Sequence, residues 1–365
     1  MENTVYDEGK NKRGTRGIKI YAAIITLGFV SAATLLTYML IDKAKDNKEA
    51  VATGGDTVVN SADYISASQA AELVESEHEL AYSKGYDESR SEILGTIKDR
   101  MSGGDTTLSV LRELFPEYLV HNDTDGFVFG EILDLPKNSF KKGDFWMDTE
   151  AGELKYIGDN KNISAYKTID VSKFQGKIDW DKVKADGVEY VFIRVGLRGY
   201  GSGALVEDEY FKENIEGAKK AGIKVGVYMF SEAINEEEAR EEAQFVIERI
   251  KNYDIELPVV LDIEDIAGED GRNEALSKEE LTRVCKIFFD EVKKEGYNTM
   301  LYGNIKCLVT MVDLEQLKDT DIWYAFYNDD IYIPYEVAGW QYASDGHVDG
   351  IAGNCDLNIF FKEWD

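Results

Sequence analysis

The chain has 365 residues, enough for one large domain with further segments, and its formal net charge of −29 argues against a nucleic-acid partner. The charge is uneven, because residues 1–60 carry 8 basic and 7 acidic side chains and the remainder therefore carries about −30. Three widely spaced cysteines and three histidines show none of the paired spacings that hold metals. We expect buried thiols, no metal site and no cofactor.

Residues 20–41 are uncharged and apolar, and at 1.5 Å per residue a helix over this range spans about 33 Å. They predict a single-pass transmembrane helix. The basic residues 1–19 predict a cytoplasmic tail, which places everything after the helix outside the cytoplasm. A cleaved signal peptide and a secreted protein are the alternative, because residues 30–32 resemble a cleavage site. Against this alternative, apolar residues continue for nine positions beyond Ala32.

Two segments are expected between the membrane helix and the main domain. Residues 42–67 are small, polar and charged, which is typical of a flexible linker. Residues 68–157 predict a helical stalk over 68–100, with Ser68 as its N-cap, and then a small α+β module. A coiled coil is the alternative for the stalk, but its apolar heptads are interrupted by Gly85 and by polar residues. We find no chemistry in the module.

From residue 158 to residue 365 strands and helices alternate. Strands are expected at 167–171, 190–195, 224–230, 258–264, 299–303, 321–326 and 338–342. Helical stretches separate the first five, which predicts a parallel sheet. After residue 321 the connections are short, so we expect the sheet to finish with antiparallel strands. The fold class is therefore α/β, an irregular TIM-like barrel.

Four acidic residues follow apolar strands, and strand ends are where catalysis sits in a β/α barrel. They are Asp170 in IDVSKFQG, Asp262 and Glu264 in PVVLDIED, and Asp356 in GNCDLN. Residues two apart on a strand point to the same side, so Asp262 and Glu264 should share one environment. Two carboxylates in a dry site do not both ionise easily, and glycosidic cleavage needs such a proton donor. A structural salt bridge to Arg194 or Arg272 is the alternative.

Aromatic residues also follow the strand period of two near these acids. Aromatic side chains on strands are usually core, but a flat ring with a hydroxyl or indole N–H suits a sugar. Tyr228, Tyr327 and Trp340 lie near the strand ends that carry the acids. The candidate sugar-binding side chains are Tyr228, Phe230, Tyr302, Tyr327, Trp340 and Gln341.

Residues from about 167 to 361 resemble glycoside hydrolase family 25, the N-acetylmuramidase type of lysozyme. The resemblance rests on IDVSKFQGKIDW, VFIRVGLRGYG, AGIKVGVYMF, PVVLDIED, WYAFY, GWQY and GIAGNCDLN, which occur in family order. It implies a (β/α)5β3 barrel, Glu264 as general acid/base, and Asp170, Asp262 and Asp356 as the other active-site carboxylates. Phe174 departs from the Trp or Tyr that many relatives carry there.

The resemblance implies a peptidoglycan hydrolase that cleaves the β-1,4 bond between N-acetylmuramic acid and N-acetylglucosamine with retention, and glycan strands as its partner. The attacking group is either the substrate's own acetamido oxygen, which we favour, or Asp356. Two other functions stay open: a catalytically inactive wall-binding module, and a glycosidase for another polysaccharide. The sequence leaves the oligomeric state open.

Overall fold

The computed structural model describes residues 67–123, 126–265 and 271–364. The chain divides into two units, one ending at Gly104 and one running from Asp105 to Asp365. The expected tail at 1–19, membrane helix at 20–41 and nearly all of the linker at 42–67 lie outside the described residues. Within the part of the chain that the structure describes, no helix combines the length and the apolar character that a membrane span requires.

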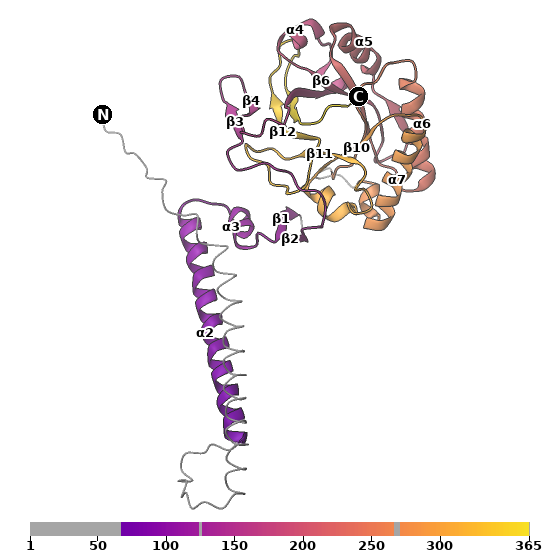
Figure 1. Ribbon diagram of the computed structural model, residues 1–365. Helices are drawn as coiled ribbons and strands as arrows, with labels where there is room; N and C mark the ends of the chain where they lie inside the picture. Colours follow the sequence, from indigo (N-terminus) through magenta and orange to yellow (C-terminus); the bar gives the residue numbers. More distant parts are fainter. Residues whose placement is uncertain (1–66, 124–125, 266–270, 365) are drawn as a thin grey trace, which may run out of the picture. The chain divides into compact units, whose positions relative to one another are not determined.

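Helix α2 (Ala67–Ser102) belongs to the first unit and corresponds to the predicted stalk helix (Figure 1). Its described side chains are exposed or half-buried along the whole length, including large apolar ones such as Leu80 and Tyr82. Charged pairs one turn apart, such as Lys84 and Glu88, help to stabilise a helix that packs little surface.

The small α+β module is the first part of the second unit. Its elements are α3 (Thr107–Leu114), β1 (Tyr118–Asp123), β2 (Gly126–Glu131), β3 (Phe145–Asp148) and β4 (Glu153–Tyr156). β1 pairs antiparallel with β2, and β3 with β4 through a turn in which Gly152 takes a φ of 68°, as the predicted hairpin requires. Leu119, Phe145 and Leu154 are buried in the same core as the barrel strands, so the module and the barrel form one unit.

The main sheet closes into a ring of eight strands, because β5 pairs with β6 at one end of the strand order and with β13 at the other. β7 is added at the side of β6. The strands are β5 (Tyr166–Val171), β6 (Tyr190–Arg198), β7 (Leu205–Glu207), β8 (Lys224–Phe230), β9 (Val259–Asp262), β10 (Thr299–Asn304), β11 (Asp321–Ala325), β12 (Gly339–Gly346) and β13 (Cys355–Phe360). This closed mixed sheet agrees with the expected irregular α/β barrel.

Helices cover the outside of this ring, α5, α6 and α7 among them (Figure 1). They are α4 (Trp180–Ala185), α5 (Phe211–Ala221), α6 (Glu236–Ile250) and α7 (Lys278–Lys294), with short helical turns η2 (Lys173–Gln175), η3 (Asn273–Ala275) and η4 (Cys307–Met311). Their ends follow the capping signals in the sequence. Asn235 accepts a hydrogen bond from Glu238 at the start of α6, Ser277 and Glu280 form a capping box on α7, and Gly222 ends α5 in the left-handed conformation.

The end of the sheet agrees with the prediction only in part, because its last strand is antiparallel but the two strands before it are not. β11 pairs in parallel with both β10 and β12, and β13 is antiparallel to its two neighbours. The connection over residues 326–338 has no helix, yet about a dozen residues are enough for a parallel crossover. The module holds this connection in place, because Asn138 donates to the carbonyl of Ile333 and Leu133 donates to the hydroxyl of Tyr335.

Side chains of the inward strand face fill the barrel with aromatic rings. Phe192 packs against Trp323 and Phe360 at centroid distances of 4.8 and 5.0 Å, and all three are buried. Inward positions nearer the carboxyl ends of the parallel strands carry polar groups instead. The aromatic layer therefore forms an apolar floor beneath the acids. The three cysteines are free and buried, as expected.

Candidate active site

The four predicted acids lie at the same end of the barrel, three of them on strands and one just after a strand. Asp170 is near the end of β5 and Asp262 is the last residue of β9. Asp356 is near the start of β13, and because that strand is antiparallel, its start lies at the same end. Glu264 comes two residues after β9 ends and stays beside Asp262. The structure thus brings all four acids together.

Asp170 is buried and held by two amide groups. Gln341 Nε2 and Asn358 Nδ2 each donate to Asp170 Oδ2 at 2.9 Å. The amide oxygens of these two residues are already occupied, because Gln341 Oε1 accepts from the hydroxyls of Tyr302 and Tyr327, at 2.8 and 3.0 Å, and Asn358 Oδ1 accepts from Trp323 Nε1 at 2.8 Å. Both amides must therefore turn their N–H groups to Asp170.

Asp170 and Asp356 share a proton. Burial raises the pKa of Asp356 to about 9, with the charge of Asp170 and a hydrogen bond to it as further causes. Burial also raises the pKa of Asp170, while the bonds from Asn358, Gln341 and Asp356 lower it. At neutral pH Asp356 carries the proton and donates it to the Asp170 carboxylate.

Asp262 and Glu264 form a second carboxyl pair. Burial raises the pKa of both groups, and the Glu264 charge and a hydrogen bond to Glu264 raise that of Asp262 further. The pKa of Glu264 moves in the expected direction: burial is its main cause and the charge of Asp170 raises it too, whereas the hydrogen bond from Asp262 lowers it. Asp262 Oδ1 is buried and accepts no hydrogen bond from the described residues. The pair holds one proton and has one acceptor atom to spare.

The two arginines considered as structural partners of this pair bind other acids. Arg194 is buried and binds Asp208, with Nε and one terminal nitrogen 2.8 and 2.7 Å from the same oxygen. Arg272 makes two bonds to Glu238, at 2.8 and 3.0 Å. Neither ion pair explains the acids at the strand ends. Arg194 still acts on them, because its charge lowers the pKa of both Asp170 and Asp262.

The predicted sugar-binding side chains divide into two groups. Tyr228 is half-buried among the acids and its pKa is raised well above the usual value, by burial first and then by the charge of Asp170. Tyr302 and Tyr327 reach the same amide, that of Gln341, and Tyr327 is 57% exposed. Phe230 lies opposite Asp262 in the pairing of β8 with β9.

Trp340 does not belong with this group. It is 0% exposed, packs edge-on against Phe145 of the module at 5.2 Å, and donates its indole N–H to the carbonyl of Phe326. Its position alternates with Gln341 on β12, so it faces the outer core. A side chain with no exposed surface offers none to a sugar, and we leave Trp340 out of the site.

Two polar residues of the site were missed in the sequence. Asn358 is two positions after Asp356 on the same strand, so the period of two that relates Asp262 to Glu264 points to it as well. Arg194 entered only as a structural alternative, although it is on the inward face of β6 together with Phe192. Both would have followed from extending each strand pattern past its acid.

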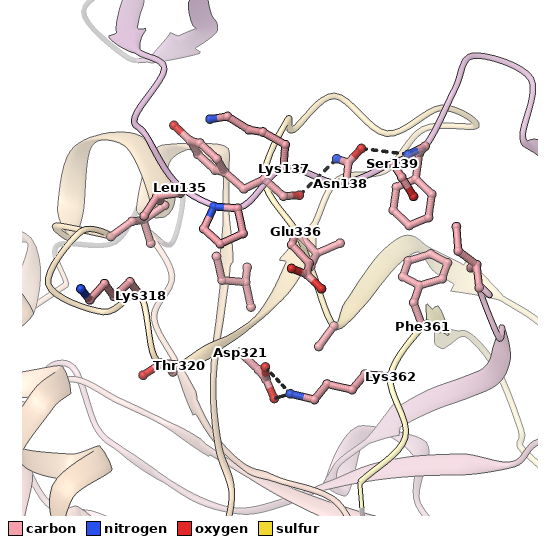
Figure 2. Close-up of a pocket in the computed structure, with 18 of the residues that line it drawn as sticks. Leu135, Lys137, Asn138, Ser139, Lys318, Thr320, Asp321, Glu336, Phe361 and Lys362 are labelled. Atoms are coloured by element: carbon pink, nitrogen blue, oxygen red, sulfur yellow. Dashed lines mark hydrogen bonds and ion pairs between the residues drawn. The ribbon is translucent and has the colours of Figure 1, made fainter. Parts of the chain in front are cut away.

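A pocket of about 650 Å³ lies at the opposite end of the barrel strands from the four acids. It is next to the first residues of β11 and to residues 135–140, which connect β2 to β3. Two of its charged residues pair with each other: Figure 2 shows Lys362 bound to Asp321, at 2.8 Å to both carboxylate oxygens. Trp364 Nε1 donates to the same carboxylate. The pocket is separate from the four acids.

Buried carboxyl groups gathered at the carboxyl ends of barrel strands are typical of the catalytic end of a β/α-barrel enzyme. The family model for glycosyl hydrolases family 25 matches residues 169–351, half of the chain, and the chain belongs to this family. The module and the stalk lie outside the matched residues.

Two relatives give the range of similarity. The chain is 27% identical over 195 residues to the autolytic lysozyme of Clostridium acetobutylicum, covering 53% of this chain and 55% of that protein. It is 26% identical over 214 residues to lysozyme M1 of Streptomyces globisporus, covering 54% and 69%. This chain thus spans about half the length of the first relative.

Solved structures give similar figures. The family 25 glycosyl hydrolase from Bacillus anthracis matches with a TM-score of 0.47 and 25% identity, over 56% of this chain and 93% of that one. The modular autolysin LytC from Streptococcus pneumoniae matches with a TM-score of 0.49 and 25% identity, over 67% of this chain and 57% of that one.

Proposed function

We propose that this protein is a peptidoglycan hydrolase that cleaves the β-1,4 bond between N-acetylmuramic acid and N-acetylglucosamine, with Glu264 as general acid/base. The observation that carries the proposal is the Asp262–Glu264 pair, in which Asp262 is buried and Glu264 half-buried, and which retains a proton at a pH where carboxyl groups are ordinarily ionised. Glycosidic cleavage needs such a proton donor beside the scissile bond. Family membership and the names of the two lysozyme relatives support the substrate class.

The spare acceptor of Asp262 suits the 2-acetamido group of the sugar. When the acetamido N–H donates to Asp262 Oδ1, it favours the ionised form of Asp262, so the shared proton moves to Glu264. Glu264 then protonates the glycosidic oxygen while the acetamido oxygen attacks the anomeric carbon and forms an oxazolinium ion. Substrate binding itself thus converts Glu264 into the acid.

The second half of the reaction reverses these roles. Glu264, now a carboxylate, takes a proton from water, and the water attacks the anomeric carbon and opens the oxazolinium ring. Two inversions give overall retention. The carboxylate of Asp170 contributes negative charge near the positive charge that develops on the sugar. Protonated Asp356 donates a hydrogen bond to this carboxylate and so keeps Asp170 ionised. A protonated Asp356 is a poor nucleophile, which supports the acetamido route over a covalent bond to Asp356.

Digestion of purified peptidoglycan tests the activity. New reducing ends should be N-acetylmuramic acid, identified by borohydride reduction and mass spectrometry. New reducing ends of N-acetylglucosamine would show that the enzyme is a glucosaminidase and not a muramidase. Binding to walls without cleavage would favour the wall-binding module, and cleavage only of a different glycan would favour another polysaccharide as substrate.

We further propose that the enzyme is held in the cell membrane by residues 20–41, with the catalytic domain outside. The support is the uncharged sequence of this stretch and the basic residues before it. The full-length chain should stay with membranes through an alkaline carbonate wash. Release by the wash, or an N-terminus near Ala33, would indicate a secreted enzyme.

A further inference from the structure

One lysine connects the module to the segment that carries the general acid. The ammonium group of Lys306, after β10, lies 2.5 Å from a carboxylate oxygen of Asp265 and 3.1 Å from one of Asp123. Asp265 directly follows Glu264, and Asp123 is the last residue of β1 in the module. The three side chains are mostly shielded, with 21–22% exposure each. The module therefore reaches the catalytic end of the barrel by a charged contact.

The backbone around Glu264 is fixed from both sides. Before it, the amide of Ile263 donates to the carbonyl of Tyr302 at 3.2 Å and continues the sheet past the end of β9. After it, the carboxylate of Asp265 binds Lys306 and also shares a hydrogen bond with Glu274. The position of Glu264 thus depends on how firmly Lys306 holds Asp265.

Lys306 holds Asp265 firmly only if a second carboxylate fixes the position of its ammonium group. A lysine ammonium is a point charge on a flexible four-carbon stem with three donors, and one carboxylate leaves most of its freedom. Asp123 supplies the second carboxylate from the module side. Two partners in a shielded place define the position of the ammonium group, whereas a single exposed ion pair contributes little.

Other contacts hold the module against the barrel independently of the ion pair between Asp123 and Lys306. A Cβ on Gly130 would meet Val309 Cγ1 at 2.2 Å, so β2 lies flush against η4. The hydroxyl of Tyr332 accepts a hydrogen bond from the backbone amide of Val120 at 2.9 Å. The guanidinium group of Arg112 stacks on the Tyr332 ring, 3.7 Å from its centroid. Loss of the Asp123 charge should leave these contacts, and hence the fold, in place.

We propose that Asp123 is a positioning residue for the reaction: through Lys306 and Asp265 it holds the general acid in place, so that the module outside the family-matched residues completes the catalytic site. The proposal rests on the proposed muramidase function. Because displacement of a catalytic group by about 1 Å can cost on the order of 100-fold in rate, a loosened anchor should lower kcat and leave substrate affinity largely unchanged.

The test compares variants of the full-length protein on purified peptidoglycan. Asp123→Asn should lower kcat by about fivefold and Lys306→Met by about tenfold or more, each with KM within about twofold of wild type. Asp123→Glu keeps the charge and should recover most of the rate. The matched control is Asp148→Asn, which breaks another carboxylate–lysine contact of the module, to Lys155 at 2.7 Å. It should leave kcat unchanged.

A second measurement does not depend on activity. Hydrogen exchange of the Ile263 amide should become about tenfold faster in Asp123→Asn and in Lys306→Met, and stay at the wild-type rate in Asp148→Asn. Equal kcat and equal exchange in Asp123→Asn and Asp148→Asn would overturn the proposal. An inactive wild type would instead overturn the proposed function, and the exchange rates would still decide whether Asp123 anchors the segment.

Discussion

Asp170 and Asp356 stand directly opposite each other on the antiparallel pair β5–β13, and their carboxyl groups share a hydrogen bond. The reversed direction of β13 creates this contact, because it brings the start of one strand beside the end of the other. Like charges this close do not both ionise, so one proton stays with the pair. Together with Asp262 and Glu264, the site contains two carboxyl pairs that each retain a proton.

The first prediction concerns Glu264. Glu264→Gln keeps the size and polarity of the side chain but has no proton to give, so it should fold normally and lose at least about 100-fold in rate. Loss of turbidity of purified cell walls measures the rate, and thermal unfolding measures the fold. Glu274→Gln, which alters a nearby acid that hydrogen-bonds Asp265, serves as control and should lose far less. A Glu264→Gln rate within about tenfold of wild type would contradict the assignment.

The second prediction concerns Asp356 and pH. In the unfolded chain this aspartate ionises near pH 4, whereas its folded pKa is about 9. Between these values the folded state binds the proton and the unfolded state does not, so the free energy of unfolding falls as pH rises through this window. Asp356→Asn does not titrate. Its melting temperature relative to wild type should therefore increase from pH 5 to pH 8.

The control for this trend is Asp148→Asn. The carboxyl group of Asp148 is half-buried and its pKa is lowered, first by the hydrogen bond from Lys155, so the same rise with pH should not occur. Thermal unfolding of all three proteins at pH 5, 6.5 and 8 measures the effect. A difference between wild type and Asp356→Asn that stays constant across these values would show that the Asp356 carboxyl group ionises normally in the folded protein.

The sequence predicts the acids better than their partners. Asp170, Asp262, Glu264 and Asp356 are recognisable because each follows a run of apolar residues, and strand ends converge in a barrel. The predicted sugar-binding role of Trp340 was wrong, because alternation along a strand defines two faces and does not say which of them points into the barrel. The contact of Trp340 with Phe145, almost 200 residues earlier in the chain, places Trp340 on the outer face. The parallel pairing of β11 with β12 likewise depends on contacts from the module.

The third prediction separates the two possible nucleophiles. If the acetamido oxygen attacks, a substrate with a trifluoroacetamido group in its place should react far more slowly, because fluorine withdraws electrons from that oxygen. The product should retain its anomeric configuration, which NMR of the fresh product measures. A trapped covalent glycosyl adduct on Asp356 would contradict the acetamido route. An inverted product would rule out both routes.

The fourth prediction starts from the way the module and the barrel share a core. Because Leu119, Phe145 and Leu154 are buried with barrel residues, a soluble fragment should begin at Asp105, before the module. A fragment that begins at Tyr156 would uncover apolar surface, including Trp340 and its neighbours, at about 25 cal/mol per Å². We expect it to aggregate or to melt well below the longer fragment. Equal melting temperatures of the two fragments would show that the module contributes nothing to the barrel's stability.

The longer fragment also tests the effect of charge. The chain after residue 60 carries about −30, so an anionic cell wall should repel the enzyme, most strongly at low salt. Digestion of isolated walls by the fragment should speed up as ionic strength rises toward about 0.15 M, where the Debye length is about 8 Å. A short soluble glycan fragment of peptidoglycan provides the control, because it lacks the anionic polymers of the wall and its cleavage should respond far less to salt. If salt changes both rates equally, repulsion by the wall is not the cause. If wall digestion instead slows as salt rises, the wall attracts the enzyme, and a membrane anchor is not needed to overcome repulsion.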